Sequence, residues 1–309
     1  MEVIELVAHG EHARFIPALG CQCLEYQVGA LQVISSTSQP NEIRLHPHRY
    51  GIPTLAPWPG RIDHARFSFG GREIKLAVNE SNGHAVHGVV CDREFNIVKR
   101  GPGFFQAELK WPRESADLQA WPFPFTLRLQ YEIGDGMRVG AVATNEGTGP
   151  MPFGFGLHPY FNLPLDPHGK RETTRLLLPA QNRRPLRADL IPDGSLAPVG
   201  GKYDLRRGDP IGDRIFDDAF CDVSPDSDGV RRARLIEASM RIALEVSADS
   251  NFDNWVIYAP SGRGVIAIEP YSCAPDAFNL TTRGVEAGMF EIAGGASWSG
   301  TIEFKIVSA

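Results

Sequence analysis

Short segments in which apolar and polar residues alternate are the feature that most restricts how this chain can fold. Five of them follow the period of two that a half-buried strand requires: Arg72–Val78, Phe125–Ile133, Met137–Thr144, Ser239–Ser247 and Ser299–Val307. Gly and Pro, 32 and 24 in number, are spread along the chain and supply turns between such segments. Long amphipathic helices are hard to find. The pattern predicts an all-β protein of antiparallel strands, each with one face in a core and the other toward water.

The length of the chain and the lack of a linker bear on its domain organisation. At 309 residues, 42% of them hydrophobic, the chain can bury a substantial core. Strand-like segments are spaced over its whole length, with no Ser- or Pro-rich linker and no internal repeat. We therefore expect residues 1–309 to form a single domain, a large antiparallel β-sandwich. Residues 163–174 and 187–214 are expected to be irregular, and loops of that length are usually functional or disordered.

Charge and cysteine content exclude several classes of protein. The formal net charge is −6 and the isoelectric point about 5.9. Basic residues are scattered, so we expect neither a nucleic-acid partner nor an anionic membrane surface. The five cysteines have no metal-binding or redox spacing, and free thiols in a reducing compartment are expected. Acidic residues near the amino terminus do not fit a signal peptide, and no run of about 18 apolar residues occurs. These features predict a cytoplasmic protein.

One histidine stands in an unusual setting, inside the stretch Gly-Phe-Gly-Leu-His-Pro-Tyr-Phe-Asn-Leu of residues 154–163. Its neighbours place the ring of His158 at the mouth of a core, where an imidazole that titrates near neutrality can act as a general acid. Glu269 is the best partner, because it ends an apolar run and precedes a proline, and a charge delivered by a buried strand is costly unless it has a function. Each residue also has a purely structural interpretation: His158 as a hydrogen-bonded core histidine, and Glu269 as a solvated charge at the end of a strand.

Three further polar residues lie in conspicuous surroundings. Arg61 ends a proline-stiffened stretch and can offer its planar set of donors to hydroxyls or a carboxylate. His87 precedes Gly88, which permits close approach of backbone or ligand. Asp217 and Asp218 follow the long loop between aromatic residues, and either aspartate can face a site. The structural alternative for each of these residues is a position in an exposed loop or turn.

The histidines also allow a metal site as a competing interpretation. His84 and His87 lie three residues apart, and His46 and His48 have the spacing of one face of a strand. No acid stands with them in a recognised ligand pattern, so we expect no metal. A cupin-like metalloenzyme that uses His46, His48 and another histidine stays an alternative at this point.

Five segments, taken in order, resemble the aldose 1-epimerase (galactose mutarotase) family. They are Pro57–Ile62, Val86–Gly88, His158–Leu163, Asp217–Phe220, and Ile268–Pro270 with Pro275–Asn279. Each is weak alone, but five in the family's order are specific. The resemblance implies the family's fold, a large antiparallel β-sandwich called a supersandwich, which agrees with the strand pattern.

The resemblance also implies an isomerase that interconverts the α and β anomers of a free aldose. It implies that Glu269 is the general base, that His158 is the general acid, and that Arg61, His87 and Asp217 bind oxygens of a monosaccharide. Opening the sugar ring needs one base and one acid, which we expect on opposite sides of a small site, and neither a metal nor an organic cofactor. Because an exposed glutamate, with a pKa of about 4.3, is a feeble base, we predict that partial burial raises the pKa of Glu269 toward that of His158.

The sequence departs from the family at two positions that bear on the identity of the sugar. Gly60 stands where members often carry asparagine, and Asn254–Tyr258 places an apolar residue where they tend to carry a glutamine that touches hydroxyls. With Arg61 as the one arginine assigned to the site, a neutral sugar is favoured over a phosphorylated one. An inactive sugar-binding or regulatory protein on the same fold is the main alternative. A glycosidase is disfavoured, because it would usually need paired carboxylates.

Overall fold

The computed structural model describes residues 2–37 and 40–309. In this part of the chain every ladder between strands is antiparallel. The largest sheet has nine strands, in the spatial order β10 (Asn96–Gly101), β11 (Phe104–Trp111), β12 (Phe125–Glu132), β13 (Met137–Asn145), β27 (Ser297–Ser308), β23 (Ile242–Ala248), β22 (Arg231–Glu237), β17 (Arg175–Leu177) and β20 (Asp209–Pro210).

A second sheet, of eight strands among the described residues, covers one half of the first. Its order is β19 (Ala197–Pro198), β18 (Ala180–Arg184), β21 (Phe216–Val223), β24 (Asn254–Ala259), β25 (Val265–Tyr271), β15 (Gly156–Leu157) and β5 (Thr54–Leu55), and β16 (Tyr160–Asn162) also pairs with β25. A four-stranded sheet covers the other half with β1 (Ile4–Ala8), β2 (Glu11–Ile16), β3 (Gln22–Val28) and β4 (Leu31–Gln32).

The remaining elements are short. Two-stranded ladders join β14 (Met151–Phe153) to β26 (Phe290–Ile292), β6 (Arg61–Ile62) to β9 (Ala85–Val86), and β7 (Arg66–Phe69) to β8 (Arg72–Lys75). The helical segments are α1 (Pro40–Leu45), α2 (Asp117–Ala120), α3 (Ala277–Thr282) and the 3₁₀ turns η1 (Asp63–Ala65) and η2 (Gly201–Tyr203).

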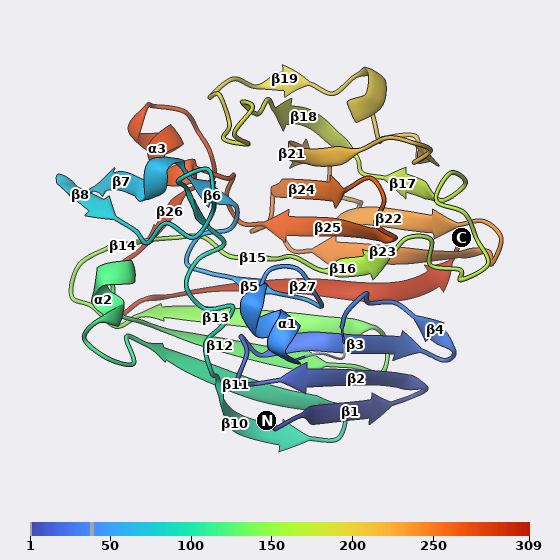
Figure 1. Ribbon diagram of the computed structural model, residues 1–309, viewed down its shortest axis with the longest axis horizontal. Helices are drawn as coiled ribbons and strands as arrows, with labels where there is room; N and C mark the ends of the chain where they lie inside the picture. The colour runs from blue at the N-terminus through green and yellow to red at the C-terminus, as the bar shows by residue number, and fades with distance from the viewer. Residues whose placement is uncertain (1, 38–39) are drawn as a thin grey trace.

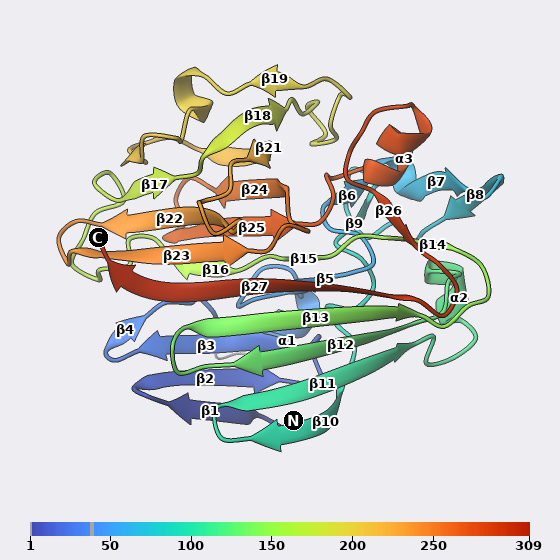
Figure 2. The ribbon, with the colours of Figure 1, turned by 180° about the vertical axis from the view of Figure 1, so that it is seen from behind.

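The layers pack face to face, as the two opposite views in Figure 1 and Figure 2 show. The sheet of β1–β4 lies over β11–β13, and β24 and β25 lie over β22 and β23. Aromatic rings meet between the layers: Phe15 lies 4.9 Å from Phe105, and Phe161 lies 5.5 Å from Phe304, between ring centroids. The core therefore fills the space between sheets, and the predicted antiparallel β-sandwich is confirmed.

Burial along the strands follows the alternation that the sequence predicts. Buried and more exposed residues alternate along β12, β13 and β27, where one face meets the core. In contrast, β25 is buried over its whole length. One of its faces packs on the core, and the other is covered by loops that enclose a cavity.

The predicted irregular segments and thiols are also observed. Residues 163–174 contain no strand or helix, and residues 187–214 contain only β19, η2 and β20. All five cysteines are buried and unpaired. Among the described residues, no helix has the length and apolar character needed to cross a membrane.

Candidate active site

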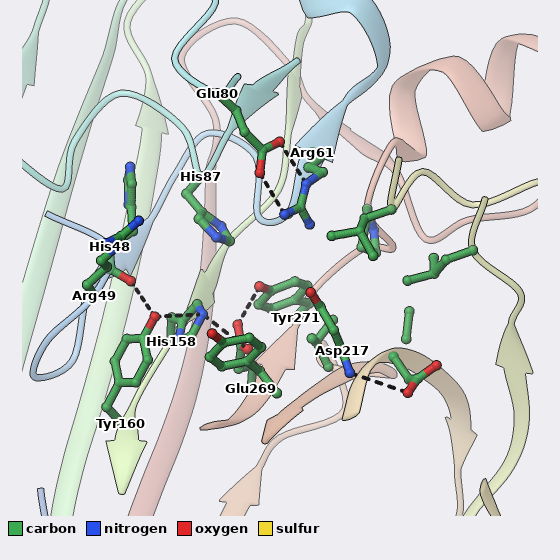
Figure 3. Close-up of a pocket in the computed structure, with 18 of the residues that line it drawn as sticks. His48, Arg49, Arg61, Glu80, His87, His158, Tyr160, Asp217, Glu269 and Tyr271 are labelled. Carbon is green, nitrogen blue, oxygen red and sulfur yellow. Dashed lines mark hydrogen bonds and ion pairs between the residues drawn. The ribbon is translucent and has the colours of Figure 1, made fainter. Parts of the chain in front are cut away.

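All five predicted site residues line one cavity of about 480 Å³. They are Arg61, His87, His158, Asp217 and Glu269, and Figure 3 shows their side chains converging on the same space. They come from β6, from the loop after β9, from the junction of β15 and β16, from β21 and from β25. A cavity of this size holds a small ligand such as a monosaccharide.

Glu269 forms the deepest part of the cavity. Its side chain is on β25 and is only 1% exposed. The hydroxyl of Tyr271 donates a hydrogen bond to Oε2 of Glu269 at 2.5 Å. Gly156 makes room for this tyrosine, because a Cβ atom there would lie 2.5 Å from the Tyr271 ring. Val256 pairs with Glu269 across the ladder, so an apolar side chain does stand on the preceding strand, as predicted.

His158 lies directly beside the carboxylate. Its Nε2 atom is 3.3 Å from Oε1 of Glu269. The ring stacks on Tyr160, with centroids 4.4 Å apart and planes at 18°, and the Tyr160 hydroxyl donates to the backbone oxygen of His48 at 2.5 Å. The two groups are thus adjacent, and the expectation of opposite sides is wrong. A hemiacetal hydroxyl and the ring oxygen share one carbon, so a base and an acid that serve them must be neighbours.

Burial shifts the pKa values of this pair in opposite directions. It raises the pKa of Glu269 well above the usual range, and the charge of Asp217 adds to the rise. It lowers the pKa of His158 to about 3. The rise predicted for Glu269 is confirmed, but the burial is complete, and the two values cross instead of approaching each other. The environment therefore favours the carboxyl of Glu269, and not the imidazole of His158, as the resting place of a proton that the two groups share.

Arg61 is held at the cavity by a carboxylate that the sequence analysis missed. Its Nε and Nη2 atoms each donate to Glu80 at 2.8 Å. Burial works against the guanidinium charge, but these bonds outweigh it and raise the pKa of Arg61. The neighbouring Gly60 has a φ of +67°, and a Cβ there would lie 2.8 Å from the ring of Pro275. Packing against Pro275 therefore explains why no side chain precedes the arginine.

His87 is fixed by an unusual backbone conformation. Its φ is +65°, and the following Gly88 has a φ of +76°. A Cβ at Gly88 would lie 1.9 Å from the Ala56 carbonyl oxygen, so the close approach predicted for this glycine is made by backbone. The His87 ring lies 5.0 Å from that of His48 and 5.4 Å from that of His158. Burial lowers the pKa of His87 well below its usual value and that of His48 to about 4.

Of the two adjacent aspartates, Asp217 faces the end of the cavity where Glu269 and Tyr271 lie. Figure 3 shows its side chain beside Tyr271. Burial raises the pKa of Asp217, opposed by the charge of Arg61. Burial also raises the pKa of Asp218, but there the opposing charges are those of Lys202 and Arg183. Asp218 therefore lies on the outer side of the cavity.

The histidine pairs of the metal interpretation are not brought together as a ligand set. Within the described residues, one group of three His, Cys, Asp or Glu side chains has ligand atoms that all lie within 4.8 Å of one another, and it consists of Asp63, His64 and His84. His84 thus belongs to a different group from His87, and Asp63 is already bound by Arg187 at 3.1 Å. In the part of the chain that the structure describes, His46 and His48 form no such group with a third histidine.

Several cavity residues were missed by sequence reasoning. They are Arg49, Glu80, Leu186, Tyr258, Arg263 and Tyr271. A signal existed for Tyr271, because it lies two residues after Glu269 on one strand and so shares its face. The others come from loops or neighbouring strands whose position depends on tertiary packing.

Unsatisfied polar atoms gather around the cavity. Among the described residues, His48, His87 and His158 each have a buried Nδ1 without a hydrogen-bond partner, and so does Oε1 of Glu269. Buried polar groups are normally paired, so four such atoms on residues that line one cavity are unusual for a region that serves packing alone. The cavity thus combines a buried imidazole and a buried carboxylate in contact with a polar lining.

Comparison with known proteins shows which family the chain belongs to. The family described as aldose 1-epimerase matches residues 2–305, and the chain belongs to it. A galactose mutarotase-like protein from Clostridium acetobutylicum has a similar structure, with a TM-score of 0.93 and 21% identity over 99% of this chain and 95% of that one. An aldose epimerase homologue from C. elegans has a TM-score of 0.84 and 15% identity over 100% and 99% of the two chains. At these identities the similarity concerns the fold.

Sequence relatives match over shorter stretches. The uncharacterized protein YihR of Escherichia coli is 29% identical over 114 residues, which cover 36% of each chain. The galactose mutarotase of Sus scrofa is 28% identical over 186 residues, which cover 57% of this chain and 53% of the relative. The aligned parts thus span about a third and about half of these relatives' own lengths.

Proposed function

We propose that the protein is an aldose 1-epimerase that interconverts the α and β anomers of a free monosaccharide. The observation that carries this proposal is the 3.3 Å contact between Nε2 of His158 and Oε1 of Glu269, both buried at the end of one cavity. A general base and a general acid at this separation can serve two oxygen atoms bonded to the same carbon.

The reaction starts from the protonation state in which Glu269 is ionised and His158 carries the proton. Glu269 takes the proton of the C1 hydroxyl, the C1–O5 bond breaks as C1 becomes an aldehyde, and His158 gives its proton to O5. Both side chains are then neutral, which is the distribution that burial favours. Rotation about C1–C2 followed by the reverse transfers closes the ring to the other anomer. Each group contributes on the order of 10²–10⁴-fold.

The remaining residues have binding and positioning roles in this proposal. Arg61, oriented by Glu80, donates to sugar hydroxyls with the edge that faces the cavity. His87, which is neutral, and Asp217 form hydrogen bonds with further hydroxyls of the sugar. Tyr271 holds the carboxylate by donating to Oε2, so Oε1 is the oxygen that lies beside His158 and meets the substrate.

A sugar-binding protein without catalytic activity is the competing function, because the same cavity would bind a sugar in either case. Polarimetry of freshly dissolved α-D-galactose and α-D-glucose separates the two. An epimerase speeds the approach of optical rotation to equilibrium in proportion to protein concentration. If calorimetry detects saturable binding of aldoses and none of the bound sugars equilibrates faster, the binding function replaces the proposed one.

A further inference from the structure

Two arginines at the mouth of the cavity have no part in the chemistry described above. Arg49 and Arg263 line the cavity and are exposed. Nη2 of Arg263 donates to the backbone oxygen of Arg49 at 3.5 Å, so the two segments meet. The Arg263 guanidinium also lies over the Tyr160 ring, 5.6 Å from its centroid.

These two guanidinium groups differ from others nearby because no carboxylate neutralises them. Within the described residues, Arg61 is paired with Glu80 and Arg187 with Asp63, whereas neither Arg49 nor Arg263 lies within 4.0 Å of an acidic oxygen. Fixed positive charge beside a buried cavity attracts an anion. Guanidinium groups are also suited to bidentate recognition of carboxylate and phosphate.

The charges of the cavity are separated between its two sides. Figure 3 shows Arg49 and Tyr160 on one side of His158, and Asp217 on the other side, beyond Glu269. Asp218 adds a second carboxylate on the side of Asp217. An anion is therefore favoured only on the side of Tyr160.

The order of atoms in an aldopyranose ring places the C6 substituent on the side of Tyr160. His158 serves O5 in the proposed reaction, and O5 is bonded to C5, which carries C6. The C6 substituent then lies beyond O5 on the side of His158, whereas O1 and O2 lie toward Glu269 and Asp217. Tyr160 stacks on His158, and Arg263 lies over Tyr160. The position of C6 and the position of the two free guanidiniums thus coincide.

We propose that the substrate is an aldose with an anionic group on C6, such as a carboxylate or a phosphate, bound by Arg49 and Arg263. This inference rests on the proposed epimerase activity and names its substrate class. It replaces the expectation of a neutral sugar, which assumed that Arg61 was the one arginine in the site.

The test compares anomer exchange of D-glucose, D-glucuronate and D-glucose 6-phosphate by exchange NMR, each above its spontaneous rate. D-galactose and D-galacturonate repeat the comparison with C4 inverted. We expect at least one anionic sugar to have a kcat/KM about tenfold or more above that of its neutral parent. The comparison of carboxylate with phosphate shows which anion the arginines accept.

Arginine variants link the preference to the two side chains. Arg49→Gln and Arg263→Gln should each lower the ratio of kcat/KM for the anionic sugar to that for the neutral parent by roughly 5- to 50-fold, mainly through KM. Arg72→Gln, an exposed arginine on β8 away from the cavity, is the matched control and should leave the ratio unchanged. Raised ionic strength should reduce the preference, because the two groups are exposed.

Two outcomes overturn the inference, and they differ in what they leave standing. If wild type accelerates glucose or galactose and shows no preference for the anionic sugars, or if the preference survives both substitutions, the arginine site is wrong and the epimerase activity stands. If no sugar of the panel is accelerated, the proposed function fails and this inference fails with it.

Discussion

The cavity has two regions that are built differently. Its floor consists of the side chains of His158, Glu269 and Tyr271, which lie on or beside strands of the eight-stranded sheet and are buried. Its rim, the side chains of Arg49, Arg61, Glu80 and Arg263, comes from β6 and from loops, and it is partly or fully exposed. Large pKa shifts of acid–base groups occur at the floor, whereas the rim carries one ion pair and two guanidinium groups without a carboxylate partner among the described residues.

Under the proposed function, this difference separates the residues that transfer protons from the residues that recognise the ligand. At the floor, hydrogen bonds and packing from the sheet hold Nε2 of His158 3.3 Å from Oε1 of Glu269, a precision that loops seldom achieve. At the rim, charge is presented to whatever part of the ligand projects from the floor. Substitutions at the floor should therefore act on kcat, and substitutions at the rim on KM.

The largest effect is expected for Glu269→Gln, which keeps the shape and removes the base. We expect kcat to fall roughly 10³–10⁴-fold, as measured by polarimetry at neutral pH. Glu303→Gln is the control, because burial also raises the pKa of Glu303 but that residue is on β27, away from the cavity. Comparable losses in both variants would show that the effect is structural.

His158→Asn should come next, with a loss of roughly 10²–10³-fold in kcat. The substitution removes the proton carrier for O5 but leaves Glu269 in place. His12→Asn removes a surface histidine whose Nδ1 lies 3.7 Å from Glu25, and it should have no effect. Retention of wild-type kcat by His158→Asn would remove this residue from the mechanism.

The pH profile of kcat/KM should be bell-shaped, because the active pair holds one proton. At low pH, His158 and Glu269 both become protonated and the base is lost; at high pH, the pair loses its proton and the acid is lost. Tyr271→Phe removes a hydrogen bond that lowers the pKa of Glu269. The alkaline limb should therefore move to higher pH, and kcat should fall roughly 3- to 30-fold. A downward shift of that limb would contradict the assigned donor, and Tyr203→Phe serves as the remote control.

Rim variants should change binding more than turnover. Glu80→Gln weakens the bidentate contact that orients Arg61, and we expect KM to rise about tenfold with kcat within about threefold. Initial rates over a range of sugar concentrations give both constants. A large fall in kcat with no change in KM would show that Arg61 and Glu80 act on turnover, which contradicts the binding role assigned to the rim.

The smallest expected effect concerns stability. Because the folded pKa of Glu269 is raised above 4.5, the folded protein binds more protons than the unfolded chain, and stability is lost as pH rises through the raised pKa. Glu269→Gln has no such loss. Its advantage in the free energy of unfolding over wild type should grow as pH rises from about 4.5, which urea titrations at several pH values can measure. A constant difference would mean that this carboxyl has no raised pKa.

Sequence reasoning succeeded where the determinant is local. Alternation along β12, β13 and β27 reflects which face of each strand meets the core, so these strands and the sandwich could be predicted. Glu269 was identifiable because a charge at the end of a wholly apolar run is costly. Arg61, His87 and Asp217 were identified through the family's motifs, which place them in one site without giving its geometry.

The remaining features depend on contacts between distant parts of the chain. The separation of His158 and Glu269 is set by the pairing of β16 with β25, and strand register is not encoded in either segment alone. Glu80, Arg49 and Arg263 lie in ordinary loop sequence, and only tertiary packing brings them to the rim. The crossing of the two pKa values follows from complete burial, which the sequence of either strand does not specify.

A double-variant cycle on the floor tests the central claim most directly. Exchange NMR of anomer interconversion would be measured for wild type, Glu269→Gln, His158→Asn and the double variant, with the fold of each checked by its melting temperature. If the two residues act as one proton-transfer unit, the double variant should be no more than about threefold slower than the slower single variant. Losses that multiply, or a single variant that keeps the wild-type rate, would contradict an acid–base pair at this site.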